Sequence, residues 1–346
     1  MGLPKRACRC NQGYVYAPAV SSETTVRCGA LQMAREYDLD KKSPRIVVLM
    51  STYNGRKYLR EQMDSLLAQT MDDICIFVHD DGSVDGTVDI LQEYADKYSQ
   101  VVFYESKKAG YPECFFKLLW DAPEAEYYAF SDQDDYWMPE KLAVAVANLD
   151  GRPEPALYCS AKMIVDEQLN PLGRKDSKPL KGIQNALLKV NQASGCTMVF
   201  NAALRNIILQ YHPKKAPYHD SWVFKVAMLF GEIIYDDNPY MKYRQHASNT
   251  DGAHAVGYRL LCKRLKSFDL TFKRYRQQRS ATDYAQELLE AYENQISEED
   301  RAVIYHIAHA RERLKSRWKL FFMKGLDTSP FYEYVWLKSK ILLGWI

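Results

Sequence analysis

The sequence lacks any apolar run long enough to cross a bilayer, because no stretch reaches the roughly 18 consecutive apolar residues that a membrane helix needs. Lys5 and Arg6 are not followed by an apolar segment, so we expect no signal peptide. The absence of internal repeats and of low-complexity segments excludes solenoids and extended disorder. What remains is a globular composition: 346 residues, of which 47% are hydrophobic and 26% charged, can bury a substantial core.

The sequence also has little net charge, yet its charges are unevenly distributed. The formal net charge is only +2. Residues 256–279 carry eight Lys or Arg against Asp269, and residues 311–324 carry six against Glu312, so these two segments total +12 and leave −10 for the rest of the chain. A basic C-terminal region and an acidic remainder predict different tasks for the two parts.

Eight cysteines are scattered along the chain, several of them inside apolar runs, where cysteine acts as a small buried side chain. This pattern favours a reducing compartment, and we expect the protein in the cytoplasm. Cys8, Cys10 and Cys28 could supply three ligands of a zinc site, but no fourth ligand is evident. We therefore favour unstructured thiols in residues 1–44, an N-terminal extension whose role stays open.

Four continuous apolar runs predict buried strands, at residues 45–51, 74–80, 101–106 and 127–132. Alternation with helical patterns predicts an α/β fold whose mostly parallel sheet lies between helices. The helices are indicated by apolar stripes at Leu59, Met63, Leu66 and Leu67, at Val88, Leu91, Ala95 and Tyr98, and around Phe115 to Trp120.

Polar clusters follow three of these strands, at the point where each strand ends. They read "STYNG" (51–55), "DDGSVDGT" (80–87) and "SDQDD" (131–135). Ligands bind at the carboxyl ends of strands in parallel sheets, so we expect all three clusters to face one crevice.

The "SDQDD" cluster concentrates negative charge. Asp132, Asp134 and Asp135 cannot all lie close together and ionised without a compensating positive charge. Two carboxylates at i and i+2 can reach one Mg²⁺ or Mn²⁺ together with phosphate oxygens, and we favour this interpretation. The alternative is a solvated turn before a helix that begins near Pro139 and Glu140.

The "DDGSVDGT" cluster resembles the first half of an EF-hand loop. Gln92 stands where that loop needs Glu, and a strand precedes the cluster instead of a helix, so we do not expect calcium. Asp85 is better placed as a helix N-cap. Asp80 and Asp81 are then free to accept a hydrogen bond from a ligand, such as a nucleobase N–H.

Six motifs in order resemble the family-2 glycosyltransferases of GT-A fold, especially the rhamnosyltransferase-like members. To the three clusters above, with "SDQDD" extended to "SDQDDYWMPEKL", the chain adds "SGCTMVFN" (194–201), "HDSW" (219–222) and "YRQHASN" (243–249). The resemblance implies a GT-A nucleotide-sugar-binding domain over residues 45–255. Residues 256–346 would form a C-terminal helical extension.

The resemblance also implies roles for the matching positions. Asp132 and Asp134 would form the DxD motif that binds Mn²⁺ or Mg²⁺, with His246 as an additional ligand. Asp220 would be the general base, with His219 and Trp222 on the acceptor side. The nucleotide sugar would contact Thr52, Tyr53, Asn54, Asp80, Asp81, Asp132 and Gly195. Cys114 stands where relatives commonly have Asn, so that donor contact is not expected.

The implied reaction is an inverting transfer of one sugar from a nucleoside-diphosphate sugar, dTDP-rhamnose or a UDP-sugar, to a saccharide acceptor. Processive synthases of this family typically show QxxRW, and Leu314 stands here where Gln is needed. A catalytically inactive nucleotide-sugar-binding module is the main alternative. A nucleotidylyltransferase would need a Gly-rich signature that "STYNG" does not provide.

The basic C-terminal region carries an apolar stripe at Leu261, Leu265, Phe268, Phe272 and Tyr275. Its helices could pack on the catalytic domain or on each other, or lie on an anionic membrane. We favour the membrane, at the inner face of the cell membrane, because the acceptor of such relatives is often a lipid-linked saccharide. Nucleic acid is not expected as a partner, and a homodimer is left open.

Overall fold

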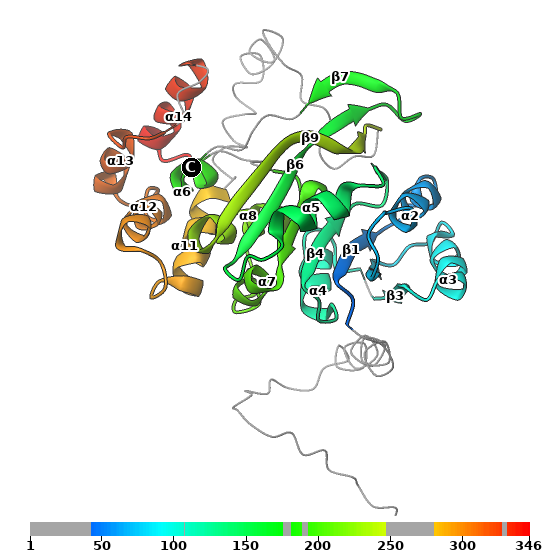
Figure 1. Cartoon of the computed structure of the whole chain (residues 1–346). Coiled ribbons are helices and arrows are strands. Elements are labelled where there is room, and N and C mark those ends of the chain that lie inside the picture. Colours follow the sequence, from blue (N-terminus) through cyan, green and yellow to red (C-terminus); the bar gives the residue numbers. More distant parts are fainter. Residues whose placement is uncertain (1–42, 107, 176–180, 189–192, 247–279, 327–330) are drawn as a thin grey trace, which may run out of the picture.

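The computed structural model describes residues 43–106, 108–175, 181–188, 193–246, 280–326 and 331–346 (Figure 1). The cysteines of the N-terminal extension and the predicted apolar stripe at 261–275 lie outside the described residues. The four cysteines at 75, 114, 159 and 196 are buried, as expected from their apolar surroundings.

The predicted parallel strands are confirmed in the first half of the chain. Strand β1 pairs in parallel with β2 and β4, and β2 pairs in parallel with β3. Their bounds are β1 Ile46–Thr52, β2 Ile74–Asp80, β3 Val101–Glu105 and β4 Tyr127–Ser131.

The second half of the chain extends the same nine-stranded sheet in the order β3-β2-β1-β4-β8-β6-β9-β5, with β7 paired to β6. Strand β8 runs antiparallel to both β4 and β6, whereas β6 and β9 are parallel. The bounds are β5 Tyr136–Trp137, β6 Ala156–Val165, β7 Pro171–Lys175, β8 Met198–Asn201 and β9 Glu232–Arg244.

Strand β1 is apolar throughout because both faces of the sheet are covered. Val47 and Leu49 belong to one core cluster, and Ile46, Val48 and Met50 belong to the other. Alternate side chains point to opposite faces of a strand, so a continuous apolar run is what a doubly covered sheet requires.

The helices predicted after β1, β2 and β3 are present, as α2 (Leu59–Leu67), α3 (Thr87–Lys97) and α4 (Glu113–Asp121). The stripe of α2 is buried as expected. In α3 the buried positions are Thr87, Ile90, Leu91 and Tyr94. Of the predicted stripe, Leu91 is buried, and Ala95 and Tyr98 are partly buried against the same core. Later helices are α5 Lys141–Leu149, α6 Ile183–Leu188, α7 Ala202–Ile208 and α8 His219–Phe230.

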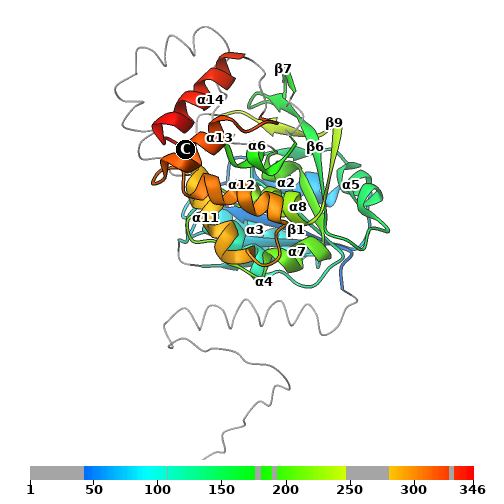
Figure 2. The same ribbon diagram turned by 90° about the vertical axis from the view of Figure 1, so that its left-hand side faces the viewer.

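Four C-terminal helices lie on one side of the domain (Figures 1 and 2). Their bounds are α11 Ser280–Tyr292, α12 Glu298–Ala308, α13 Leu314–Phe321 and α14 Phe331–Leu343. Tyr284, Leu288 and Ile304 share a core cluster with Trp222 of α8, so α11 and α12 pack on the catalytic domain. Among the described helices, none has the length and hydrophobicity needed to cross a bilayer.

Candidate active site

A cavity of about 340 Å³ opens beyond the carboxyl ends of β1, β2 and β4. It therefore lies at the edge of the sheet to which the three polar clusters were assigned. Its lining residues are Ser51, Tyr53, Asp81, Lys108, Gly110, Tyr111, Cys114, Phe115, Asp132, Gln133, Asp134, Ser194, Gly195, His219, Asp220 and Tyr243. Five of the six motifs supply the predicted residues among them.

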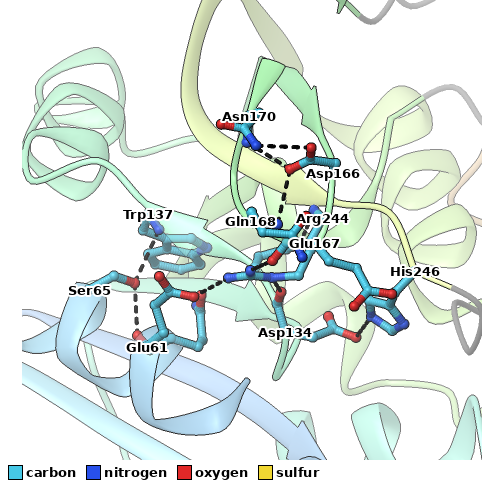
Figure 3. A network of polar contacts seen from close by, with 12 residues as sticks. Glu61, Ser65, Asp134, Trp137, Asp166, Glu167, Gln168, Asn170, Arg244 and His246 are labelled. Atoms are coloured by element: carbon cyan, nitrogen blue, oxygen red, sulfur yellow. Dashed lines mark hydrogen bonds and ion pairs between the residues drawn. The ribbon is translucent and has the colours of Figure 1, made fainter. Parts of the chain in front are cut away.

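The acidic loop after β4 is held by Arg244, which is the last residue of β9 (Figure 3). The Arg244 Nε donates to the Asp134 carbonyl oxygen at 2.8 Å, and its backbone N–H donates to Asp135 Oδ1 at 3.1 Å. The same guanidinium pairs with Glu61 and donates to the Glu167 carbonyl oxygen. This buried cation fixes the backbone of the loop.

Asp134 and His246 are brought together as the resemblance implied. The His246 Nε2 lies 2.9 Å from Asp134 Oδ2, and its ring stacks on Tyr58 with centroids 4.9 Å apart. A carboxylate and an imidazole nitrogen at this separation can bind one cation between them.

Burial, together with the neighbouring charges of Asp134 and Asp220, raises the pKa of Asp132 to about 7. The pKa of Asp135 lies well above its usual range for the same first reason, and the Asp135 Oδ2 is buried without a hydrogen-bond partner among the described residues. Oxygen atoms of these two acids and the Cys196 sulfur lie within 4.8 Å of one another. The loop is therefore short of positive charge.

This donor set fits a divalent cation with hard-ligand preference, such as Mg²⁺ or Mn²⁺. The carboxylates of Asp132 and Asp134 could supply oxygen ligands, and His246 could supply a nitrogen. Burial raises the pKa of the Cys196 thiol well above its usual range, so this sulfur stays protonated and is a poor ligand for either ion.

The expectation that Asp80 is free to contact a ligand is wrong. The side chain is fully buried, and its oxygens accept hydrogen bonds from Thr52 Oγ1 at 2.7 Å, Ser83 Oγ at 2.7 Å and the backbone N–H groups of Gly82 and Ser83 at 3.0 and 2.8 Å. Asn54 accepts from the Val84 N–H at 2.9 Å. Thr52, Asn54 and Asp80 therefore build the turn beneath the cavity and do not line it.

Asp81 does line the cavity, but it is not free either. Its two carboxylate oxygens accept hydrogen bonds from the backbone N–H groups of Ala109 at 2.5 Å and Gly110 at 2.8 Å. Beside it, the Lys108 ammonium lies 4.0 Å from the ring centroid of Tyr53 and donates to the Tyr53 hydroxyl at 2.9 Å. A nucleobase N–H would share the Asp81 carboxylate with the 109–110 backbone.

Asp220 lies in the first turn of α8 and lines the same cavity as the acidic loop. Its Oδ2 accepts from the Gly195 N–H at 3.0 Å, and its Oδ1 accepts from the Ser221 N–H at 2.6 Å. Burial raises the pKa of this carboxyl. Gly195 permits the close approach, because a Cβ there would lie 2.8 Å from the His219 Nε2.

His219 forms an apolar wall of the cavity. Its ring stacks on Phe115 with centroids 3.9 Å apart, and burial lowers its pKa to about 3, so the ring is neutral. Trp222, one turn further along α8, is fully buried in the core between Tyr211 and Tyr292 and does not reach the cavity.

Several lining residues were not predicted from the sequence, among them Lys108, Tyr243 and Ser194. Lys162 was also missed, although a lysine inside the apolar strand "ALYCSAKMIV" is itself a signal that buried acids lie nearby. Cys114 lines the cavity, and burial raises its pKa to about 11, so it contributes a neutral thiol there.

The fold and this site define a glycosyltransferase of GT-A type. Residues 47–209 match the family described as "Glycosyl transferase family 2", so this part of the chain is a domain of that family, and the chain resembles a rhamnosyl transferase.

Relatives and solved structures agree with this assignment. The dTDP-rhamnosyl transferase RfbG of Shigella flexneri is 29% identical over 233 residues, which cover 62% of this chain and 78% of that one. An uncharacterized glycosyltransferase of Nostoc sp., alr2836, is 39% identical over 101 residues, which cover 28% and 30% of the two chains. The fold matches that of S. aureus TarS 1–349 in complex with UDP-GlcNAc, with a TM-score of 0.56, 19% identity and coverage of 87% and 80%.

Proposed function

We propose that this protein is an inverting, metal-dependent transferase that moves one sugar from a nucleoside-diphosphate sugar to a saccharide acceptor in cell-surface polysaccharide synthesis. The observation that carries the proposal is the single cavity that Asp132 and Asp134 share with the buried Asp220. The name of the Shigella relative favours dTDP-rhamnose as the donor. The complex of TarS with UDP-GlcNAc makes a UDP-hexose donor the alternative.

In this proposal Asp132, Asp134 and His246 hold Mn²⁺ or Mg²⁺. When bound, the ion stabilises the negative charge that gathers on the leaving diphosphate. Arg244 keeps the acidic loop in place through the Asp134 carbonyl group. The Tyr53 ring and Asp81 lie on the nucleoside side of the cavity, under the Lys108 ammonium.

Asp220 takes the proton of the acceptor hydroxyl in the proposed reaction. Inversion requires attack from the face opposite the leaving group, and this proposal assigns that face to Asp220, which shares the cavity with the acidic loop. The raised pKa makes the carboxylate a stronger base than a solvated Asp, and such a base contributes about 10²- to 10⁴-fold to the rate. In this proposal the neutral ring of His219 lines the acceptor side of the cavity and excludes water from it, and it takes no part in proton transfer. Trp222 only anchors α8.

Substitution of Asp220 tests the proposal. We expect Asp220→Asn to lower turnover at least about 10³-fold, because the amide keeps the shape of the side chain but cannot accept the proton. Donor affinity should change less than about threefold. The measurement is release of nucleoside diphosphate from a panel of dTDP- and UDP-sugars with Mn²⁺.

The matched control is Asp237→Asn, which changes an exposed Asp of β9. Turnover by Asp220→Asn within tenfold of the parent protein would show that the base is elsewhere. Parent protein that binds donors but releases no diphosphate with any saccharide acceptor would favour the inactive binding module.

A second surface supports a membrane-bound acceptor. On α13 and at its end, Leu314, Trp318 and Phe322 recur every four residues and are 67%, 53% and 70% exposed. Val335 and Leu342 of α14 are also exposed and line a groove with Phe322. Figure 2 shows these two helices beyond α11 and α12, away from the sheet.

Charge complementarity favours an anionic lipid surface as the occupant of this apolar face. Lys315, Arg317 and Lys319 of α13 lie beside the exposed side chains in sequence, and each basic residue near such a surface adds about 1 kcal/mol to binding. We propose that α13 and α14 hold the enzyme at the cytoplasmic face of the cell membrane, where a lipid-linked saccharide is within reach.

Liposome binding tests this second proposal. The double variant Trp318→Gln/Phe322→Gln should bind vesicles of phosphatidylglycerol about tenfold more weakly than the parent, because two large apolar side chains are lost from the interface. The control is Leu172→Gln, which changes an exposed leucine on β7. Parent protein that does not bind the vesicles at low salt contradicts the proposal. If that protein sediments as a dimer and the double variant sediments as a monomer, the apolar face instead joins two copies of the chain.

A further inference from the structure

Lys162 is a buried lysine in the middle of β6, and the proposed mechanism gives it no part. The residue is only 7% exposed. An ammonium group loses hydration when it is buried, so a lysine at such a place needs polar partners.

The partners of Lys162 belong to the cavity wall. The Nζ donates a hydrogen bond to Ser194 Oγ and lies 3.9 Å from the ring centroid of Tyr243 on β9. Both Ser194 and Tyr243 line the cavity. The ammonium group therefore lies between β6, β9 and the turn that precedes Gly195.

This turn is hydrogen-bonded to the proposed base, Asp220. Ser194 precedes Gly195, whose N–H donates to Asp220 Oδ2 at 3.0 Å. The other side of the turn is closed by Thr197, whose Oγ1 and backbone N–H donate to the Ser194 carbonyl oxygen at 2.7 and 2.9 Å. Lys162 is thus linked to the Asp220 carboxylate in three steps. Its hydrogen bond to Ser194 comes first, then the Ser194–Gly195 backbone, and then the hydrogen bond from the Gly195 N–H to Asp220.

The positive charge of Lys162 also favours the ionised form of the Asp220 carboxylate. It lowers the pKa of Asp220, against the larger effect of burial. The titratable and charged groups around Asp220 are His219 and Lys225 on α8, Tyr284 on α11, Asp132 after β4, and Lys162 on β6. Lys225 donates a hydrogen bond to the Ser221 hydroxyl on its own helix, whereas Lys162 lies on β6, outside that helix.

We propose that Lys162 is a positioning residue for Asp220: its ammonium group anchors Ser194, and the Ser194–Gly195 turn then fixes the carboxylate toward the acceptor side of the cavity. The proposal rests on the function proposed above, in which Asp220 accepts the acceptor proton. It predicts that Lys162 matters for proton transfer and little for donor binding.

Three variants test the proposal. Lys162→Met keeps the length of the side chain and removes its charge, Lys162→Arg keeps the charge, and Ser194→Ala removes only the hydrogen-bond acceptor. We expect Lys162→Met to lower kcat about 10- to 100-fold while the donor KM changes less than about threefold, because a displaced base impairs attack and not binding.

The pH profile separates positioning from a merely structural role. The acid limb of the kcat/KM profile should move up by about half a pH unit or more in Lys162→Met, since a positive charge that favours the ionised carboxylate is lost. In Lys162→Arg the acid limb should return to the parent's pH, because the charge is kept. Ser194→Ala should lower kcat but leave the acid limb at the parent's pH. Calorimetry should show that Mn²⁺ binds Lys162→Met at least as tightly as the parent, because loss of one cation favours another.

A parent-like kcat and an unmoved acid limb in Lys162→Met would overturn the proposal. If that variant does not fold, a parent-like kcat in Ser194→Ala overturns it instead. Asp220→Asn distinguishes this failure from failure of the proposed function. An active Asp220→Asn removes the base and this proposal together, whereas an inactive one beside a parent-like Lys162→Met removes only the role of Lys162.

Discussion

Two groups of carboxylates stand at the carboxyl ends of β2 and β4, the two strands that flank β1, and they differ in how their charge is balanced. After β2, the oxygens of Asp80 and Asp81 accept hydrogen bonds from backbone N–H groups and hydroxyls at 2.5 to 3.0 Å. After β4, the pKa of Asp132 is raised to about 7 and Asp135 keeps a buried oxygen without a partner among the described residues.

The difference teaches that aspartates in similar sequence positions can serve opposite purposes. Donors from the turn after β2, from Thr52 and from the backbone of residues 109–110 satisfy these acids, so they stabilise the fold and need no cation. The loop after β4 is held from outside by Arg244, which binds its backbone and leaves its carboxylates short of positive charge. We propose that a cation completes the second group and not the first.

The largest expected effect concerns the second group. Asp134→Ala should lower Mn²⁺-dependent turnover about 10²- to 10³-fold, because the proposed site loses one of its oxygen ligands and the bound cation stabilises the leaving group by several kcal/mol. The thermal stability of the metal-free protein should not fall. Asp72→Ala, at an exposed position before β2, is the control. Full turnover by Asp134→Ala would erase the contrast between the two groups.

The next effect concerns the first group. Asp80→Ala should lower the free energy of unfolding by about 2 to 4 kcal/mol, since it leaves the Thr52 hydroxyl and the Gly82 and Ser83 N–H groups without their acceptor. Urea denaturation measures this change. The comparison fails if Asp80→Ala unfolds at the parent's midpoint but loses nucleotide binding.

The smallest effect concerns pH. Because the pKa of Asp132 is raised from 3.8 to about 7 in the folded protein, its stabilising contribution is present below about pH 4 and is lost as pH rises through 7. The metal-free protein should therefore be more stable at pH 5 than at pH 8, by about 1 kcal/mol after allowance for the solvent in the cavity.

Two variants of this pH experiment sharpen it. Asp132→Asn should reduce the difference in stability between pH 5 and pH 8, since one titrating group is gone while Asp135, whose pKa is also raised, remains. Mn²⁺ should raise the stability of the parent at pH 8 more than at pH 5, because only the ionised carboxylate binds it. The unfolding free energy is measured by chemical denaturation at both pH values. An equal difference between pH 5 and pH 8 for the parent and for Asp132→Asn would contradict the assignment.

The sequence was sufficient for β1 to β4 and for the place of the cavity. Strands buried on both faces are apolar at every position, and their carboxyl ends must meet at one edge. The antiparallel insertion of β8 between β4 and β6 was not predicted, because its pairing joins segments far apart in the chain.

The chemistry of the site was only partly predictable. Asp80 is followed by Gly82 and Ser83, a turn pattern in which an Asp binds the backbone ahead of it, and this signal was overlooked. The anchoring of the acidic loop by Arg244 could not be read locally, since 109 residues separate Arg244 from Asp135. The same holds for Trp222, whose core position depends on Tyr292 of α11.

The most direct test of the central claim is titration calorimetry of dTDP and UDP into the parent protein, with and without Mn²⁺. If the carboxylates after β4 bind a cation that bridges to the diphosphate, at least one nucleotide should bind at least about tenfold more tightly with Mn²⁺, a gain of about 1.4 kcal/mol. Asp134→Ala should abolish that gain. Equal affinities with and without the ion, for both nucleotides, would contradict the account.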